Sequence, residues 1–162
     1  MGWLKFAACM LLAGLVTAHY ANHRRIPVDA FRMLRSFPHS VAMSSSSNDT
    51  RFKCLTGSLT RYNQREKKAT YVWHLKARGG NPARNITFDI TGTDVPDQVT
   101  YVVDNDPTHP LTAYYNYTDY RNCMVTIVPY DNHDHCLLWV KPSIVHRIPR
   151  NCIVAHEENC DV

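Results

Sequence analysis

The sequence predicts an all-β domain in which eight antiparallel strands form a barrel or a two-sheet sandwich, with a short helix near each end. Apolar runs of strand length recur through residues 40–140, and turn residues such as Gly79-Gly80-Asn81-Pro82 separate them. Successive runs lie roughly 10–13 residues apart, which is typical of consecutive antiparallel strands joined by tight turns. The sequence contains no internal repeat of long period.

The expected strands follow one another along the middle of the chain, and the first of them is the weakest. In chain order they cover residues 40–44, 52–62, 70–76, 85–91, 98–103, 111–117, 123–128 and 135–140. An up-and-down arrangement of eight such strands can close into a barrel that holds one small ligand.

A helix is expected on each side of the strands. Residues 27–35 carry Val28, Phe31 and Leu34 at helical spacing, and Pro38 follows the segment. After the last strand, Ile148-Pro149 opens a stretch that suits the first turn of a second helix.

The beginning of the chain predicts secretion. Lys5 precedes an apolar run over residues 6–16, and Val16-Thr17-Ala18 is a plausible small-residue cleavage site. The run is too short to span a membrane, and no second apolar run follows it. We therefore expect a signal peptide at residues 1–18 and one domain at residues 19–162, secreted into the extracellular space.

Cysteine and glycosylation patterns agree with that compartment. Cleavage removes Cys9 and leaves five of the six cysteines, which are expected to form disulfides in an oxidising environment. Three Asn-x-Ser/Thr sequons predict N-glycans at Asn48, Asn85 and Asn116.

The charge is mildly positive and unevenly spread. The net charge is +4, with most Lys and Arg before residue 85 and most Asp and Glu after it. No basic cluster alternates with aromatic residues as in nucleic-acid-binding motifs. We interpret the asymmetry as basic and acidic strands side by side in one sheet, and we expect no nucleic-acid partner.

The sequons indicate which side chains face the interior, because a glycan cannot point into a core. If Asn85 faces outward, Phe88 faces inward; if Asn116 faces outward, Tyr115 and Tyr117 face inward. In the last hairpin, a tip at 131–132 places two further pairs on one face, Met124 opposite Trp139 and Thr126 opposite Leu137. The expected ligand-binding residues are Tyr71, Trp73, Phe88, Tyr115, Tyr117, Met124, Thr126, Leu137 and Trp139.

The C-terminal part of the chain has a specific spacing of cysteines and a tryptophan: Cys123-Met124-Val125, Leu137-Leu138-Trp139, Ile148-Pro149 before Cys152, and Cys160 near the chain end. With this spacing, nearly all of the mature chain resembles the tick salivary lipocalins, including the histamine-binding-protein-like and japanin-like members. It implies an eight-stranded lipocalin (calycin) barrel on which the C-terminal helix packs. It also implies a secreted protein that sequesters small mediators or binds host proteins during feeding, without turnover or a cofactor.

The resemblance also bears on the ligand. The family's amine binders carry an acid just after the first of these cysteines and a Glu before Leu-Trp or Leu-Tyr, whereas this chain has Met124 and Leu137. An ammonium buried against Met and Leu would lose its hydration without a counter-charge. The expected ligand is therefore a sterol, fatty acid or leukotriene, and the expected outcome is modulation of host immune or inflammatory responses. The alternatives are a histamine or serotonin scavenger with an altered site, and a protein-binding immunomodulator that uses the barrel as a scaffold.

Five cysteines allow more than one disulfide arrangement. We pair Cys54 with Cys160, and we pair Cys123 with Cys152, which the hairpin register and the family spacing both favour. Cys136 is then the odd thiol, so the protein is expected to be a monomer or a dimer bridged through Cys136. The alternative bond between Cys123 and Cys136 needs a shifted hairpin register.

Other motifs carry less information. His133-Asp134-His135-Cys136 has the residue types of a metal site, but neighbours on a strand point to opposite faces, so we predict no metal. Gly-x-Ser-x-Gly, His-Glu-x-x-His and glycine-rich phosphate loops are all missing from the sequence. We therefore expect a binding protein and no enzyme.

Overall fold

The computed structural model describes residues 27–45, 52, 54–77 and 80–160. The expected signal peptide at residues 1–18 and the sequon at Asn48 lie outside the described residues.

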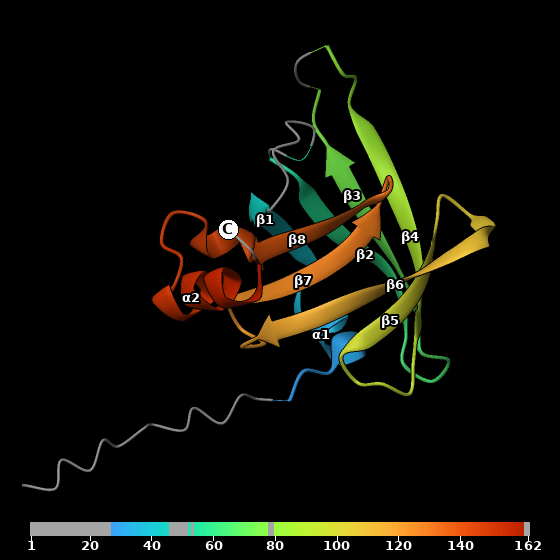
Figure 1. Cartoon of the computed structure of the whole chain (residues 1–162), viewed down its shortest axis with the longest axis horizontal. Helices are drawn as coiled ribbons and strands as arrows, with labels where there is room; N and C mark the ends of the chain where they lie inside the picture. Colours follow the sequence, from blue (N-terminus) through green and yellow to red (C-terminus); the bar gives the residue numbers. More distant parts are fainter. Residues whose placement is uncertain (1–26, 46–51, 53, 78–79, 161–162) are drawn as a thin grey trace, which may run out of the picture.

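The eight strands form a closed antiparallel barrel in the order β1 to β8, in which β1 pairs with β8 (Figure 1). This confirms the all-β barrel and excludes the two-sheet sandwich. The strands are β1 (His39–Ser45), β2 (Thr56–Asn63), β3 (Lys68–Leu75), β4 (Arg84–Gly92), β5 (Gln98–Val103), β6 (Asp106–Thr118), β7 (Cys123–Tyr130) and β8 (His133–Val140).

The β7–β8 hairpin has the predicted register. Met124 pairs with Trp139 and Thr126 with Leu137. The tip consists of Asp131 and Asn132, whose φ angles of 53° and 60° are the positive values that a tight two-residue hairpin turn requires. The turn therefore sets which side chains of both strands face the interior.

Two strands begin four or more residues away from the predicted start, whereas the other boundaries differ by two residues at most. Strand β2 begins at Thr56, so Cys54 lies in the preceding turn with a φ of 63°. Strand β6 begins at Asp106 because the turn before it needs only Asp104 and Asn105, both at positive φ. The first residues of β6 are exposed.

Helix α1 (Ala30–Ser36) lies at one end of the barrel (Figure 1). Asp29 caps it, because its side chain accepts a hydrogen bond of 2.8 Å from the Arg32 backbone N–H. The helix therefore begins three residues after Pro27, where the sequence predicted its start. Buried side chains of α1, among them Met33 and Leu34, pack into the main core.

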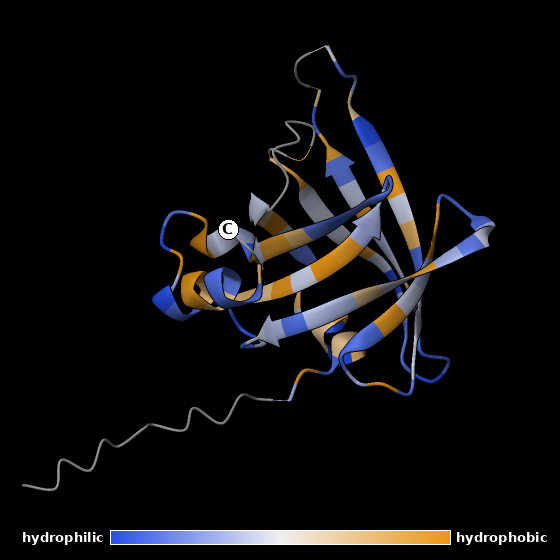
Figure 2. Cartoon of the chain, viewed as in Figure 1, coloured by the Kyte–Doolittle hydropathy of each residue, from blue (hydrophilic) through white to orange (hydrophobic). Residues whose placement is uncertain are grey.

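Helix α2 (Arg150–Asn159) follows the short 3₁₀ turn η2 (Pro142–Ile144) and packs on the outer face of β7 and β8. Figure 2 shows apolar residues on α2 and on the two strands beside it. The cluster beneath the helix includes Val125, Leu138 and Val140, all of them buried. None of the helices among the described residues is both long and apolar enough to cross a lipid bilayer.

Two disulfides hold α2 against this hairpin. Cys123 bonds to Cys152, the expected pair, and Cys136 bonds to Cys160. The expected Cys54–Cys160 bond is wrong: the end of α2 lies beside β8, whereas Cys54 is a free, exposed thiol in the turn before β2. Because Cys136 is already bonded, the expected intermolecular bridge through Cys136 is wrong as well.

This pairing makes a direct prediction for thiol chemistry. Among the five cysteines that the structure describes, iodoacetamide should alkylate Cys54 alone in the native, unreduced protein, because an exposed thiol is accessible and a disulfide does not react. Peptide mapping by mass spectrometry checks the result, and Cys54→Ala should take up no label. Labelling of Cys136 or Cys160 would contradict the pairing.

A buried histidine separates the two disulfides on the helix. Cys152, His156 and Cys160 are four residues apart and share the face of α2 that is turned to the barrel. His156 is 5% exposed, and its Nε2 atom has no hydrogen-bond partner among the described residues. Burial lowers the pKa of His156, and the nearby Glu157 carboxylate partly opposes the shift.

We expect His156 to make folding pH-dependent. Its folded pKa lies below the unfolded value of about 6.5, so the unfolded chain binds the proton first as the pH falls. The stability that neutral His156 contributes to the folded state is therefore present above about pH 6.5 and is lost as the pH falls toward the folded pKa. Urea unfolding at several pH values between 5 and 8 measures this. The free energy of unfolding should change less with pH in His156→Leu than in the matched control His146→Leu, which removes an exposed histidine. An equal change in both variants would contradict this role.

Candidate ligand cavity

The barrel encloses a cavity of about 40 Å³. All of its lining side chains are uncharged, and most are aromatic or aliphatic. They come from α1 and from β3 to β8: Leu34, Tyr71, Trp73, Phe88, Ile90, Val99, Tyr101, Ala113, Tyr115, Met124, Thr126, Val128 and Trp139.

Most of the predicted ligand-binding residues meet at this cavity. Those that line it are Tyr71, Trp73, Phe88, Tyr115, Met124, Thr126 and Trp139. Leu137 is fully buried in the core of the barrel but does not line the cavity. Its position is therefore part of the packing around the cavity.

Tyr117 is the predicted residue that the structure places elsewhere. The register of β6 against β7 shifts between Tyr115, which pairs with Thr126, and Tyr117, which pairs with Val125. Asn116 is the extra residue of this bulge, so Tyr115 faces inward and Tyr117 faces outward. The Tyr117 hydroxyl accepts a hydrogen bond of 2.9 Å from the Asn151 amide of α2. The prediction that Tyr117 faces inward was wrong, because it assumed that side chains alternate between the two faces of β6 without a bulge.

Several lining residues were not among the predicted ligand-binding residues. Val99 and Tyr101 alternate with polar residues on β5, and this period of two in the sequence indicates that both face the interior. Leu34 comes from α1, and its helical spacing indicated only that it is buried somewhere. Ile90, Ala113 and Val128 complete the wall.

The Tyr71 ring is held from two sides. Its hydroxyl donates a hydrogen bond of 3.1 Å to the Phe37 carbonyl and lies 2.8 Å from the Ser40 hydroxyl. Gly57 on β2 faces the ring so closely that a β-carbon at this position would overlap it. A glycine is therefore required at residue 57 for Tyr71 to occupy its place.

Two other polar groups of the wall are also used within the protein. The Tyr101 hydroxyl donates to the Pro129 carbonyl. The Trp139 indole N–H donates a hydrogen bond of 3.1 Å to the Thr126 hydroxyl. These bonds use the Tyr101 O–H and the Trp139 N–H, so neither donor is free for a polar ligand.

The cavity carries no charge at physiological pH. Burial raises the pKa of Tyr71, Tyr101 and Tyr115 far above the usual value for a phenol, so all three stay protonated. No acidic or basic side chain lines the cavity. An ion transferred into it would lose its hydration without compensation, whereas a neutral molecule would not.

Aromatic rings occupy most of the barrel interior. The ring centroids of Trp73 lie 4.6 Å from Phe88 and 5.6 Å from Trp139. The remaining 40 Å³ is enough for a few water molecules, whereas sites for drug-sized ligands measure about 300–1,000 Å³. A ligand of that size must therefore displace some of these rings.

Phe52, in the connection between β1 and β2, closes the aromatic cluster on one side. It is 4% exposed, and its ring contacts Trp73 and Tyr130 edge to face, with centroids 6.2 Å away in each pair. Phe52 also lines a second hollow of about 190 Å³, together with Lys76 and Arg84.

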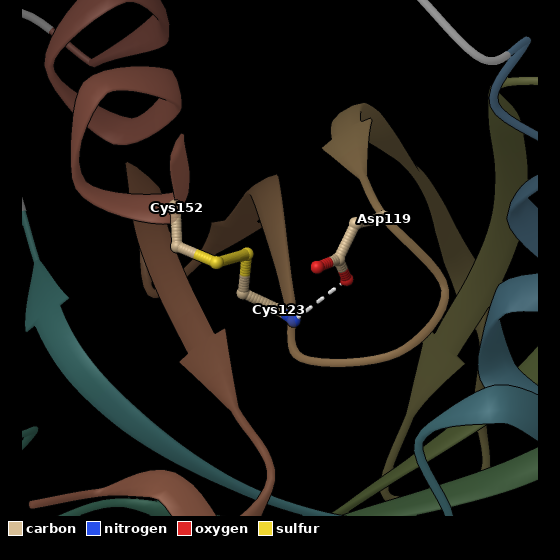
Figure 3. A group of neighbouring side chains, drawn as sticks. All are labelled: Asp119, Cys123 and Cys152. Atoms are coloured by element: carbon tan, nitrogen blue, oxygen red, sulfur yellow. Dashed lines mark hydrogen bonds between the residues drawn. A yellow bond between two sulfur atoms is a disulfide. The ribbon is translucent and has the colours of Figure 1, made fainter. Parts of the chain in front are cut away.

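One group of potential metal ligands lies at the start of β7. Asp119, Cys123 and Cys152 place carboxylate and sulfur atoms within 4.8 Å of one another (Figure 3). The two sulfurs form a disulfide and supply no thiolate. Asp119 instead closes the β6–β7 turn by accepting backbone hydrogen bonds from Asn122 at 2.7 Å and Cys123 at 3.1 Å. Burial opposes its ionisation, but hydrogen bonds from Asn122, Arg121 and Cys123 produce a net lowering of the Asp119 pKa.

The His133-Asp134-His135-Cys136 motif on β8 does not form one site either. His133 is exposed, His135 is buried against Phe52, and Cys136 is bonded to Cys160 on the outer face. The sulfur of Cys136 therefore cannot join the two imidazoles in one site.

Comparison with known proteins places this barrel in a family. The family model for the tick histamine binding protein matches residues 28–162. The chain belongs to the tick histamine-binding protein family. A search of the curated proteins gave no match to this tick lipocalin.

Two solved structures show the same fold at low sequence identity. The AM182 serotonin complex has a TM-score of 0.58 and 16% identity, and the alignment covers 82% of this chain and 84% of that one. Japanin from Rhipicephalus appendiculatus, bound to cholesterol, has a TM-score of 0.57 and 14% identity, with 76% and 87% of the two chains covered. Both neighbours are complexes with a small molecule, serotonin in one and cholesterol in the other.

Proposed function

We propose that this tick lipocalin is secreted and sequesters a small, neutral, apolar host ligand of the sterol type inside its barrel. The observation that carries the proposal is the chemistry of the cavity, which combines aromatic and aliphatic side chains with phenol hydroxyls and contains no charge. Such a wall solvates a hydrocarbon skeleton that has one polar end. The cholesterol in the japanin structure shows that this fold accommodates a sterol in a relative.

Sequestration of a host mediator requires no turnover and no cofactor. Removal of the ligand from its receptor or carrier is the step by which we propose that the protein modulates host immune or inflammatory responses. Asn85 on β4 is exposed and Asn116 at the β6 bulge is half-buried, and we propose that both carry the N-glycans of a secreted protein.

The same cavity disfavours amines. Met124 lines it and Leu137 packs behind it, at the positions where the family's amine binders carry acids. We expect histamine and serotonin to bind no tighter than about 100 μM, because an ammonium there has no counter-charge. Isothermal titration calorimetry with each amine measures this, and Met124→Asp, which places a carboxylate in the cavity, should bind more tightly. A submicromolar constant for the unmodified protein would refute the expectation.

Native mass spectrometry tests the sterol proposal directly. Protein secreted from eukaryotic cells and then loaded with cholesterol should show one additional mass of a single sterol, which disappears on denaturation. The matched control is Ala113→Trp, which fills the cavity from β6 and should prevent loading. An unmodified protein that takes up no sterol, fatty acid or leukotriene would refute sequestration of an apolar ligand.

A second function is favoured by the small free volume of the barrel. A filled barrel is a rigid scaffold. A larger groove of about 670 Å³, lined mainly by residues of β2 to β5, carries mixed charges, including Arg61, Glu66 and Asp89. Under this alternative the protein binds a host protein through its outer surface. The Ala113→Trp variant separates the two functions, because residue 113 lines the interior cavity and does not line the groove.

A further inference from the structure

The Tyr115 hydroxyl is the one phenol of the cavity wall that makes no hydrogen bond to any described residue. Tyr71 donates to Phe37, and Tyr101 donates to Pro129. Tyr115 is 6% exposed, and its ring projects from β6 into the cavity. The fully buried atoms without a partner among the described residues do not include this hydroxyl, so its oxygen keeps some accessible surface. A phenol that lines a cavity without a protein partner is therefore open to a hydrogen bond from or to a ligand.

The surroundings of Tyr115 define what partner it would accept. Its neighbours in the cavity include Tyr71 and Tyr101, and burial together with these two phenols keeps its hydroxyl protonated. The group is therefore a neutral donor in an apolar enclosure. A carboxylate would bring an uncompensated charge, and a hydrocarbon would leave the donor unsatisfied. The best match is an uncharged molecule with one oxygen acceptor.

We infer that the Tyr115 hydroxyl is the polar anchor of the ligand site and selects neutral ligands that carry a hydroxyl or carbonyl oxygen. This inference rests on the proposed function, since it specifies the ligand class for the same cavity. The ligand oxygen would lie beside β6, and the apolar body would lie along Trp73, Phe88 and Trp139. Tyr115 is then the residue that distinguishes an alcohol from the hydrocarbon of the same shape.

The test compares ligand pairs that differ only by the oxygen. The first pair is cholesterol and cholest-5-ene; the second is benzyl alcohol and toluene, which need far less space. Dissociation constants are measured for the unmodified protein, for Tyr115→Phe and for the control Tyr101→Phe. Both substitutions remove one phenol oxygen from the same wall, but the Tyr101 hydroxyl already has a partner in Pro129.

We expect Tyr115→Phe to weaken binding of the alcohol relative to the hydrocarbon by about fivefold to tenfold, the effect of one neutral hydrogen bond. Tyr101→Phe should change that ratio by less than about twofold. The same ratio in Tyr115→Phe as in the unmodified protein would overturn the inference, even if both ligands bind more weakly. Circular dichroism verifies that each variant is folded.

The two ligand pairs separate this inference from the proposed function. If neither sterol binds the unmodified protein, the sterol proposal fails, and the benzyl alcohol and toluene ratios alone decide the role of Tyr115. If none of the four molecules binds, both are refuted.

Discussion

Removal of both disulfides is expected to lower the free energy of unfolding by about 5–7 kcal/mol. The bonded cysteines are 29 and 24 residues apart, and the chain-entropy model gives each loop of this length about 3–4 kcal/mol. A domain of this size is stable by only about 5–15 kcal/mol, so the loss approaches the whole stability. Urea unfolding of the variant in which Cys123, Cys136, Cys152 and Cys160 are all alanine measures the effect.

The structure also predicts which element unfolds first in the variant without the two disulfides. Helix α2 covers Val125, Leu138 and Val140, and without the two bonds this short helix should leave the hairpin first. Hydrogen exchange should therefore become fast in α2 before it does in β7 and β8. Cys54→Ala is the matched control and should change stability by less than about 0.5 kcal/mol, because Cys54 is exposed and unbonded. A loss below about 2 kcal/mol in the quadruple variant would contradict the anchoring role.

The effects of the two bonds should not add independently. Both hold the same helix to the same hairpin, so either bond alone keeps α2 close to its place. Removal of one pair should therefore cost less than half of the effect of removing both.

The parts of the fold that the sequence predicted well are those determined by local signals. The hairpin register followed from two tip residues at 131–132, and the inward face of β4 followed from the outward Asn85. Strand number and order followed from turn residues between apolar runs. Each of these depends on neighbours within a few positions of the chain.

The errors concern features that depend on how distant segments meet. The bulge at Asn116 arises where β6 adjusts its register to β7, and no residue type in β6 required it. The partner of Cys160 depends on the direction in which α2 crosses the hairpin. Cys160 follows Cys152 by eight residues, which is about 12 Å along a helix. Cys136 pairs with Ile127, four residues after Cys123 on β7, which is about 13 Å along the strand, so the two spacings match.

The size of the cavity was the least predictable property of the site. The sequence indicated an aromatic interior but left open whether the barrel is filled or hollow. The structure shows that Trp73, Phe88 and Trp139 turn toward one another and leave about 40 Å³. Side-chain rotation, which has no signature in the pattern of residues, decides this volume.

Trp73→Ala is expected to destabilise the barrel by about 3–5 kcal/mol while enlarging the site. The Trp73 ring is 3% exposed and contacts Phe52, Phe88, Tyr130 and Trp139, so its removal leaves a cavity that the rigid barrel cannot close. Apolar cavities of this kind stay dry and bind small hydrocarbons.

The enlarged site gives this variant a distinctive response to ligand. Toluene should raise the unfolding midpoint of Trp73→Ala more than that of the unmodified protein, because binding to the folded state alone stabilises it. The control Val72→Ala changes the neighbouring residue, which faces outward on the same strand, and should cost less than about 1.5 kcal/mol without any gain in toluene binding. Thermal unfolding with and without toluene measures both effects. A Trp73→Ala protein as stable as the unmodified one, or one that does not respond to toluene, would show that the ring does not fill the ligand space.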